Sequence, residues 1–152
     1  MDKENFKKAY EKATWLCSKS EKCSADMLIY LNKYELSNDE KADIVAKLVE
    51  EKYVDDRRYA LAFASDKFKF NKWGKIKISY ELKRKNINSS FIDEALEQIN
   101  EEEYMQVIKN LILQRRIVAD NEYEYSQKVL RYMLGKGYEP ELVDEVLKSL
   151  KK

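Results

Sequence analysis

The chain carries an apolar pattern that recurs three times at one constant spacing. Sliding the sequence against itself by 51 residues, without gaps, brings apolar positions of three successive segments into register. The aligned triplets are Ala9, Ala60 and Leu111; Met27, Ile78 and Val129; Leu31, Leu82 and Met133; Leu36, Ile87 and Tyr138; Ile44, Ala95 and Val146; Val45, Leu96 and Leu147; and Leu48, Ile99 and Leu150. One offset that serves three copies indicates a repeat protein built from stacked supersecondary units. We therefore predict three units, residues 1–51, 52–102 and 103–152.

The apolar spacing within each unit predicts three short helices joined by brief connections. The expected helices run from about Lys3 to Cys17, Lys22 to Tyr34, and Asn38 to Glu51; Asp55 to Phe70, Lys75 to Lys85, and Ser89 to Glu101; and Glu103 to Val118, Glu122 to Leu134, and Pro140 to Leu150. With 3 Gly and 1 Pro, the chain has too few turn residues for many short strands. We predict an all-α fold in which three tandem three-helix repeats form an elongated, curved helical array.

One segment offers a different structure. Residues 67–82 alternate polar and apolar side chains on both sides of the turn-like sequence Asn71-Lys72-Trp73-Gly74, which is typical of a β-hairpin. The segments aligned with it in the other two units have helical spacing instead. The repeat therefore favours a helix here.

Several residues are typical of helix boundaries. Asp55 and Asp56 suit the start of a helix at Arg57, where a carboxylate caps free N–H groups and meets the positive end of the helix dipole. These two carboxylates could also hold Mg²⁺, but adjacent residues at a helix start point in different directions. Ser89 or Ser90 precedes the acidic residues of another predicted helix. Gly135, Gly137 and Pro140 are expected to end one helix and open the next.

Composition removes many classes of enzyme. The sequence has no His, no glycine-rich phosphate loop, and two cysteines, Cys17 and Cys23, whose spacing fits neither a zinc site nor a disulfide framework. We expect no catalytic site, no metal and no cofactor. No apolar run approaches the ~18 residues of a membrane span, and the N-terminus lacks the apolar core of a signal peptide. A cytoplasmic monomer without membrane contact is expected.

Positive charge is concentrated in the middle unit. Overall, 29 Lys and Arg nearly balance 28 Asp and Glu, so any attraction to a polyanion must come from an uneven distribution of these charges along the chain. From Lys67 to Lys85, eight basic residues face Glu81 alone, a local balance of +7. The candidate binding residues are Arg57, Arg58, Lys67, Lys69, Lys72, Lys75, Lys77, Lys83, Arg84 and Lys85, with Arg115, Arg116, Lys128 and Arg131 as a secondary set. Phe68, Phe70 and Trp73 lie among these lysines.

Two interpretations of this basic run stay open. Basic residues interleaved with aromatic rings fit contact with phosphates and stacking on bases, or contact with an acidic protein groove. Alternatively, the lysines form a solvated helix face and the aromatic rings pack between units. For the cluster as a whole we favour a functional surface.

The middle unit resembles the core signature of the RecX family of bacterial recombination regulators. The matching stretches are residues 53–60 with Phe63, residues 74–78, residues 81–87, and Ile92 with Ala95 and Leu96. Residues 131–138, with Val143, Val146 and Leu147, resemble a second stretch of that family. The chain departs from the family pattern at Asn86 and Glu35, where Gly is usual, and at Lys77, where Arg is usual. Asn86 can adopt the left-handed conformation that Gly serves.

This resemblance implies a non-enzymatic regulator. It implies a tandem array of three-helix units that binds the RecA nucleoprotein filament and restrains its ATPase, strand exchange and filament extension. The partners would be the RecA filament and the backbone of single- or double-stranded DNA. The alternative is a helical module that acts on DNA directly, since three short helices are also the material of helix-turn-helix domains. A third possibility is a scaffold for another protein.

Overall fold

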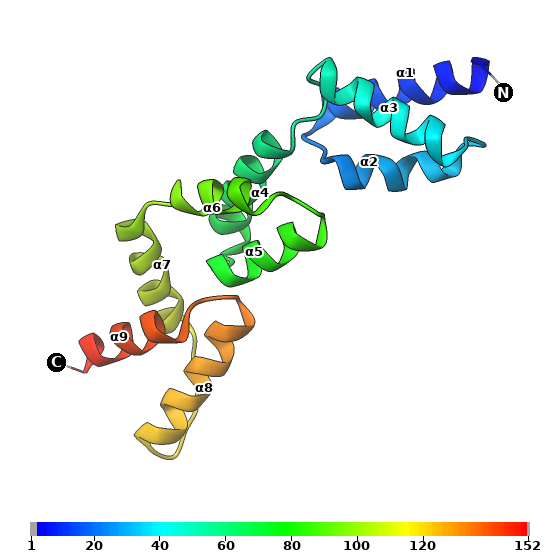
Figure 1. Ribbon diagram of the computed structural model, residues 1–152. Helices are drawn as coiled ribbons and strands as arrows, with labels where there is room; N and C mark the ends of the chain where they lie inside the picture. The colour runs from blue at the N-terminus through cyan, green and yellow to red at the C-terminus, as the bar shows by residue number, and fades with distance from the viewer. Residues whose placement is uncertain (1–2, 152) are drawn as a thin grey trace. The chain divides into compact units, whose positions relative to one another are not determined.

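The computed structural model describes residues 3–151, and its regular structure in that range is helical without a β-strand (Figure 1). The elements are α1 (Lys3–Lys19), α2 (Ser24–Tyr30), the 3₁₀ helix η1 (Leu31–Lys33), α3 (Asn38–Glu50), α4 (Asp56–Asn71), α5 (Lys75–Arg84), α6 (Ser89–Glu97), α7 (Glu101–Gln114), α8 (Glu122–Gly135) and α9 (Pro140–Leu150). The all-α prediction is confirmed. The hairpin alternative is wrong, because α4 and α5 occupy its two arms.

The boundaries differ from the predicted ones at a few places. Helix α6 ends at Glu97, earlier than expected, and Asn100 then caps α7 by accepting a hydrogen bond from the Glu103 N–H at 2.8 Å. A new helix therefore begins at Glu101, where the sequence suggested the end of the previous one. The ends of the first and third predicted units, residues 1, 2 and 152, lie outside the described range.

Several of the predicted boundary residues lie at observed helix ends. Asp55 caps α4, because its Oδ1 accepts a hydrogen bond from the Arg58 N–H at 3.0 Å, as predicted. Helix α6 starts at Ser89 as predicted, and the residue before it, Asn88, accepts a hydrogen bond from the Ser90 N–H at 2.8 Å. The end of α8 at Gly135 and the start of α9 at Pro140 are confirmed.

The structure divides into two compact units, called unit 1 and unit 2, which are not the three units predicted from the sequence. Unit 1 comprises the described residues up to Ala62 together with Leu82–Ile92, and unit 2 comprises Phe63–Glu81 together with the described residues from Asp93 onward. In unit 1, α3 packs against both α1 and α2, and in unit 2, α9 packs against both α7 and α8.

The buried positions of both units follow the 51-residue register. The triplets Met27, Ile78 and Val129, and Leu31, Leu82 and Met133, are all buried. These six residues belong to α2, η1, α5 and α8. The apolar side chains that recur in the sequence therefore form cores, and burying each contributes roughly 1.5–3 kcal/mol by removing apolar surface from water. The division into three sequence repeats itself stays a prediction.

None of the helices in residues 3–151 is both long enough and apolar enough to cross a lipid bilayer.

Candidate functional site

Arg58, Lys85 and Lys128, which are among the predicted cations, form ion pairs. Arg58 Nε lies 2.6 Å from Glu21 Oε2, and its guanidinium also donates to the Lys52 carbonyl at 3.2 Å. Lys85 Nζ lies 2.9 Å from Asp26 Oδ1, and Lys128 Nζ lies 2.9 Å from Glu124 Oε1. The hydrogen bond to Glu21 is the main cause that raises the pKa of Arg58. Their acidic partners partly neutralise these cations, which therefore offer less charge to a ligand.

Other predicted cations are exposed and are spread over several elements. They lie on α4, in the turn after it, on α5, after α7, and on α8. These residues are Arg57, Lys69, Lys72, Lys83, Arg84, Arg116 and Arg131. Of the three aromatic residues among the lysines, Phe68 is buried in unit 2 while Phe70 is 79% exposed.

A cluster of cations and aromatic rings forms in unit 2. Trp73 is half-buried and is contacted by two ammonium groups, with Lys67 Nζ at 4.9 Å and Lys77 Nζ at 4.5 Å from its ring centroid. Tyr132 is contacted by Arg115 at 4.4 Å and by Lys136 Nζ at 6.0 Å. We call these six residues, Lys67, Trp73, Lys77, Arg115, Tyr132 and Lys136, the lysine–aromatic cluster.

The backbone at the start of α5 positions this cluster. The N–H groups of Gly74 and Ile76 donate to the carbonyls of Lys136 and Gly137 at 2.7 and 2.9 Å. The intervening N–H, that of Lys75, donates to the hydroxyl of Tyr104 at 2.9 Å. Three N–H groups that a helix start leaves unpaired are therefore satisfied by α7 and by the end of α8. We call this contact, formed by residues 72–77 against Tyr104 and residues 136–138, the second seam, because a comparable contact in unit 1, described below, comes first in the chain.

Two glycines allow the second seam to close. A Cβ on Gly74 would lie 2.3 Å from the Gly137 carbonyl oxygen, and a Cβ on Gly137 would lie 2.3 Å from Lys77 Cβ. Gly137 also has φ of +93°, in the region that other residues rarely adopt. Backbones that approach this closely place residue 77 directly beside residues 136 and 137.

Three aromatic rings, tilted by 35° and 40° from one to the next, pack beside the second seam. Tyr104 is 2% exposed and its ring centroid lies 5.6 Å from that of Phe68, 5.2 Å from that of Tyr138 and 4.9 Å from Lys75 Nζ. The Tyr104 hydroxyl donates to Glu139, and the Tyr138 hydroxyl donates to the Lys72 carbonyl at 2.8 Å. Burial is the main cause that raises the pKa of both tyrosines. Both phenols therefore stay protonated and act as fixed donors.

Unit 1 contains a comparable contact at the start of α2, formed by residues 21–26 against residues 56–58 and Lys85. We call it the first seam. The Ser24 N–H donates to Asp56 Oδ1 at 2.8 Å, so the second acidic residue of the predicted pair caps α2 from a distance. Cys23 is fully buried, and burial raises the pKa of its thiol to about 11. The nearby pair of Asp26 and Lys85 completes the seam.

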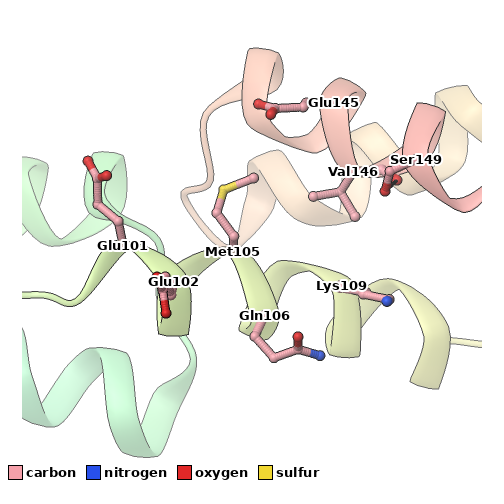
Figure 2. A pocket seen from close by; sticks show the side chains of 8 residues that line it. All are labelled: Glu101, Glu102, Met105, Gln106, Lys109, Glu145, Val146 and Ser149. Carbon is pink, nitrogen blue, oxygen red and sulfur yellow. Dashed lines mark hydrogen bonds between the residues drawn. The ribbon is translucent and has the colours of Figure 1, made fainter.

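A hollow on unit 2 has the opposite charge (Figure 2). Its volume is about 480 Å³, and α7 and α9 supply its lining. Met105 and Val146 form an apolar part, with Glu101, Glu102 and Glu145 around it. These carboxylates make the hollow unsuited to phosphate groups. Among residues 3–151, no three His, Cys, Asp or Glu side chains gather in a group able to hold a metal ion.

Comparisons with known proteins agree with the resemblance in the sequence. The regulatory protein RecX of Clostridium acetobutylicum is 30% identical over 156 aligned residues, which cover 99% of this chain and 72% of that protein. The chain belongs to the RecX family. The regulatory protein RecX of Lactobacillus gasseri is 31% identical over 129 residues, 82% of this chain and 47% of that protein. Residues 55–96 match the family model described as "RecX, second three-helix domain".

Solved structures of RecX proteins share the fold. A crystal structure of regulatory protein RecX matches 95% of this chain and 72% of that one, with a TM-score of 0.85 and 25% identity. The crystal structure of RecX from Lactobacillus salivarius matches 97% of both chains with a TM-score of 0.84 and 18% identity. The latter similarity supports the fold alone.

Two of the departures from the RecX pattern have structural explanations. Asn86 has φ of +59°, so it adopts the left-handed conformation as predicted. Glu35 occupies the corresponding position in the first unit, where α2 continues into η1 and no described residue between 30 and 40 has a positive φ. That helix therefore ends without the turn that Gly or Asn would make.

Lys136 and Tyr132 are not among the candidate residues predicted from the sequence. Both lie outside the basic run and reach the cluster through the end of α8. The 51-residue register contains the signal, because it aligns Lys136 with Lys85 and Lys77 with Asp26. The candidate residues as a binding surface stay a prediction.

Proposed function

We propose that this chain is a non-enzymatic regulator that binds the RecA nucleoprotein filament and restrains its ATPase, strand exchange and filament extension. Membership of the RecX family, whose relatives carry the name regulatory protein, supports a regulatory role. The lysine–aromatic cluster supports the choice of binding surface. Its cations lie within one unit and contact aromatic rings, so their charge is available to phosphates or to carboxylates of a partner.

The chemistry of the site fits binding better than catalysis. Burial raises the pKa of both Cys17 and Cys23, which keeps these thiols protonated and weakly nucleophilic near neutral pH. The cluster contains cations and rings but no carboxylate, His or Cys among its six residues. Its side chains offer positive charge and aromatic rings for contact with a filament.

The proposal is tested with two triple variants that remove equal charge. In the first, Lys67, Lys77 and Lys136 of the cluster become Gln; in the second, the exposed residues Lys69, Lys83 and Arg131 become Gln. We expect the first variant to lose at least about tenfold in inhibition of the DNA-dependent ATPase of RecA, and the second to lose much less. Circular dichroism checks that both stay helical.

The outcomes separate the site from the function. Equal inhibition by the wild type and both variants would reject the cluster as the binding surface. An unmodified chain that leaves the ATPase of RecA unchanged would reject the proposed function itself.

The alternative function is direct binding to DNA, which the cations and rings of the cluster also favour. In that case the chain alone should bind DNA tightly at physiological salt, with affinity that falls steeply as salt rises. The cluster variant should then flatten the slope of log K against log salt by about one for each phosphate that its side chains no longer neutralise.

A further inference from the structure

The two seams place charged residues at corresponding positions. In the first seam, Asp26 near the start of α2 pairs with Lys85 just after α5. The Asp26 Oδ1 and the Lys85 Nζ lie 2.9 Å apart. Adding 51 to both numbers gives Lys77 near the start of α5 and Lys136 just after α8. The register that aligns a carboxylate and an ammonium in unit 1 places two lysines at the corresponding positions of unit 2, where a Cβ on Gly137, the residue after Lys136, would lie 2.3 Å from Lys77 Cβ.

The second seam leaves this pair of positive charges uncompensated. Neither Lys77 nor Lys136 forms an ion pair with a described residue; Lys136 Nζ donates to the Asn71 carbonyl at 3.4 Å. Burial, and then the charge of Lys77, lower the pKa of Lys136. The positive end of α5 and the ammonium of Lys67 beside Trp73 add to the same field.

The backbone carries no net charge, so it does not neutralise the two lysines. The carbonyls of Lys136 and Gly137 already accept the N–H groups of Gly74 and Ile76, and Glu139 accepts the Tyr104 hydroxyl. The N–H groups at the start of α5 are also used, so an anion here would be held by side chains. Lysine ammonium groups bind phosphate as point charges and need no planar match.

We propose that the second seam is an oxyanion site of the phosphate class, in which one bound oxyanion bridges the ammonium groups of Lys77 and Lys136. The bound anion takes the place that the Asp26 carboxylate holds in the first seam. Its negative charge offsets the repulsion between the two lysines and draws the end of α8 to the start of α5. The two lysines also belong to the lysine–aromatic cluster, but this proposal does not depend on the proposed function, because occupancy of the site stabilises the chain without a filament.

The register itself provides the decisive variant. Lys77→Asp should restore, in unit 2, the acid–base pair of unit 1. We expect this substitution to raise Tm in chloride by about 2 °C and to abolish any further rise when phosphate replaces chloride. The wild type should gain stability with inorganic phosphate in proportion to the logarithm of its concentration above Kd. Scans are made at matched ionic strength.

A second variant and a control exclude trivial explanations. Lys136→Gln removes one ammonium without creating a pair, so it should also lose the response to phosphate. Lys7→Asp changes the net charge by the same amount as Lys77→Asp on the exposed surface of α1 and should respond like the wild type. An equal response of all four proteins to phosphate would overturn the proposal, as would a fall in Tm of Lys77→Asp.

The source of the oxyanion is distinguished with two probes. Stabilisation by inorganic phosphate alone would identify a site for a free anion. Stabilisation by a short oligonucleotide as well, lost in both site variants, would show that the site also accepts a phosphodiester. A wild type whose Tm neither probe raises at matched ionic strength would reject the site.

Discussion

The two seams solve the same packing problem by different means. At each one, the start of a helix must satisfy its free N–H groups and the adjacent charges must be neutralised. The first seam uses side-chain carboxylates, with Asp56 on the Ser24 N–H and Asp26 on Lys85. The second seam uses backbone carbonyls, two glycines and a buried tyrosine, and it leaves its lysines without acidic partners.

This difference separates structural charge from available charge. In the first seam, the cations Arg58 and Lys85 stabilise the unit and are partly neutralised by Glu21 and Asp26. In the second seam, backbone carbonyls and the Tyr104 hydroxyl satisfy the start of α5, so the charges of Lys77 and Lys136 stay available to a ligand. A surface cation is therefore informative about function only after its acidic neighbours are known.

The largest effect should come from the glycines of the second seam. Gly137→Ala places a Cβ 2.3 Å from Lys77 Cβ and at φ of +93°, so it must shift the start of α5. We expect a loss of about 3 kcal/mol in the free energy of unfolding. The 51-residue register aligns Gly137 with Asn86, which also has a left-handed backbone. Asn86→Ala keeps that backbone without the close contact, and it should lower the free energy of unfolding by about 1 kcal/mol.

Equilibrium urea denaturation of both variants measures this contrast. If the two substitutions cost the same, the close approach at Gly137 contributes nothing to stability and the two seams are equivalent in this respect. Gly74→Ala provides a second measurement, because its Cβ would lie 2.3 Å from the Gly137 carbonyl oxygen.

An intermediate effect is expected from one hydroxyl. Tyr104 is 2% exposed. Tyr104→Phe removes the hydroxyl that accepts the Lys75 N–H and donates to Glu139. We expect a loss of about 1–2 kcal/mol, because a partly buried N–H and a carboxylate lose their partner. Tyr53 occupies the corresponding position in unit 1 and is 40% exposed, so Tyr53→Phe should change stability by less than about 0.5 kcal/mol.

Thermal unfolding of the two tyrosine variants, followed by circular dichroism, compares them directly. A larger loss for Tyr53→Phe than for Tyr104→Phe would contradict the assignment of the tyrosine hydroxyl to the second seam.

The sequence predicted the cores better than the seams. The 51-residue register found Met27, Ile78 and Val129 because burial selects for apolar side chains at fixed positions of every copy. It could not show that Arg58 is neutralised by Glu21, since that pair joins residues far apart in the chain. Asn88 was missed as a cap because Ser89 and Ser90 are equally good caps by residue type.

Applied to polar residues, the same register reveals the charge difference. The alignment of Asp26 with Lys77 is visible in the sequence, but its meaning depends on knowing that residues 26 and 85 touch. Sequence alone therefore gives the candidate cations of the middle unit equal weight. The structure places some of them in ion pairs, some at exposed positions and some in the cluster, and it places Lys75 against the ring of Tyr104.

The smallest effect should come from the ion pair of the first seam. Asp26 and Lys85 have side chains that are 33% and 29% exposed, so water and salt weaken their attraction. Asp26→Asn and Lys85→Gln should each cost about 0.5–1 kcal/mol, and a double-mutant cycle should return a coupling of that size that falls as salt rises. The i,i+4 pair of Lys148 and Asp144, more exposed, should couple by only about 0.3–0.5 kcal/mol.

The pH dependence of this pair has a definite sign. Burial lowers the pKa of Lys85, but the hydrogen bond to Asp26 and nearby negative groups outweigh it and raise the pKa in the folded chain. A raised pKa means that the folded chain binds this proton more tightly, so the contribution is complete below the ordinary lysine pKa of about 10.4 and is lost as pH rises through the folded value. Lys136, with its lowered pKa, should behave oppositely, destabilising the fold at neutral pH and less so as pH rises. Measured against the wild type, Lys85→Gln should therefore be less stable and Lys136→Gln more stable at about pH 8, and both differences should shrink towards zero as pH rises to about 11. Differences of the same sign would show that the two seams carry the same kind of charge.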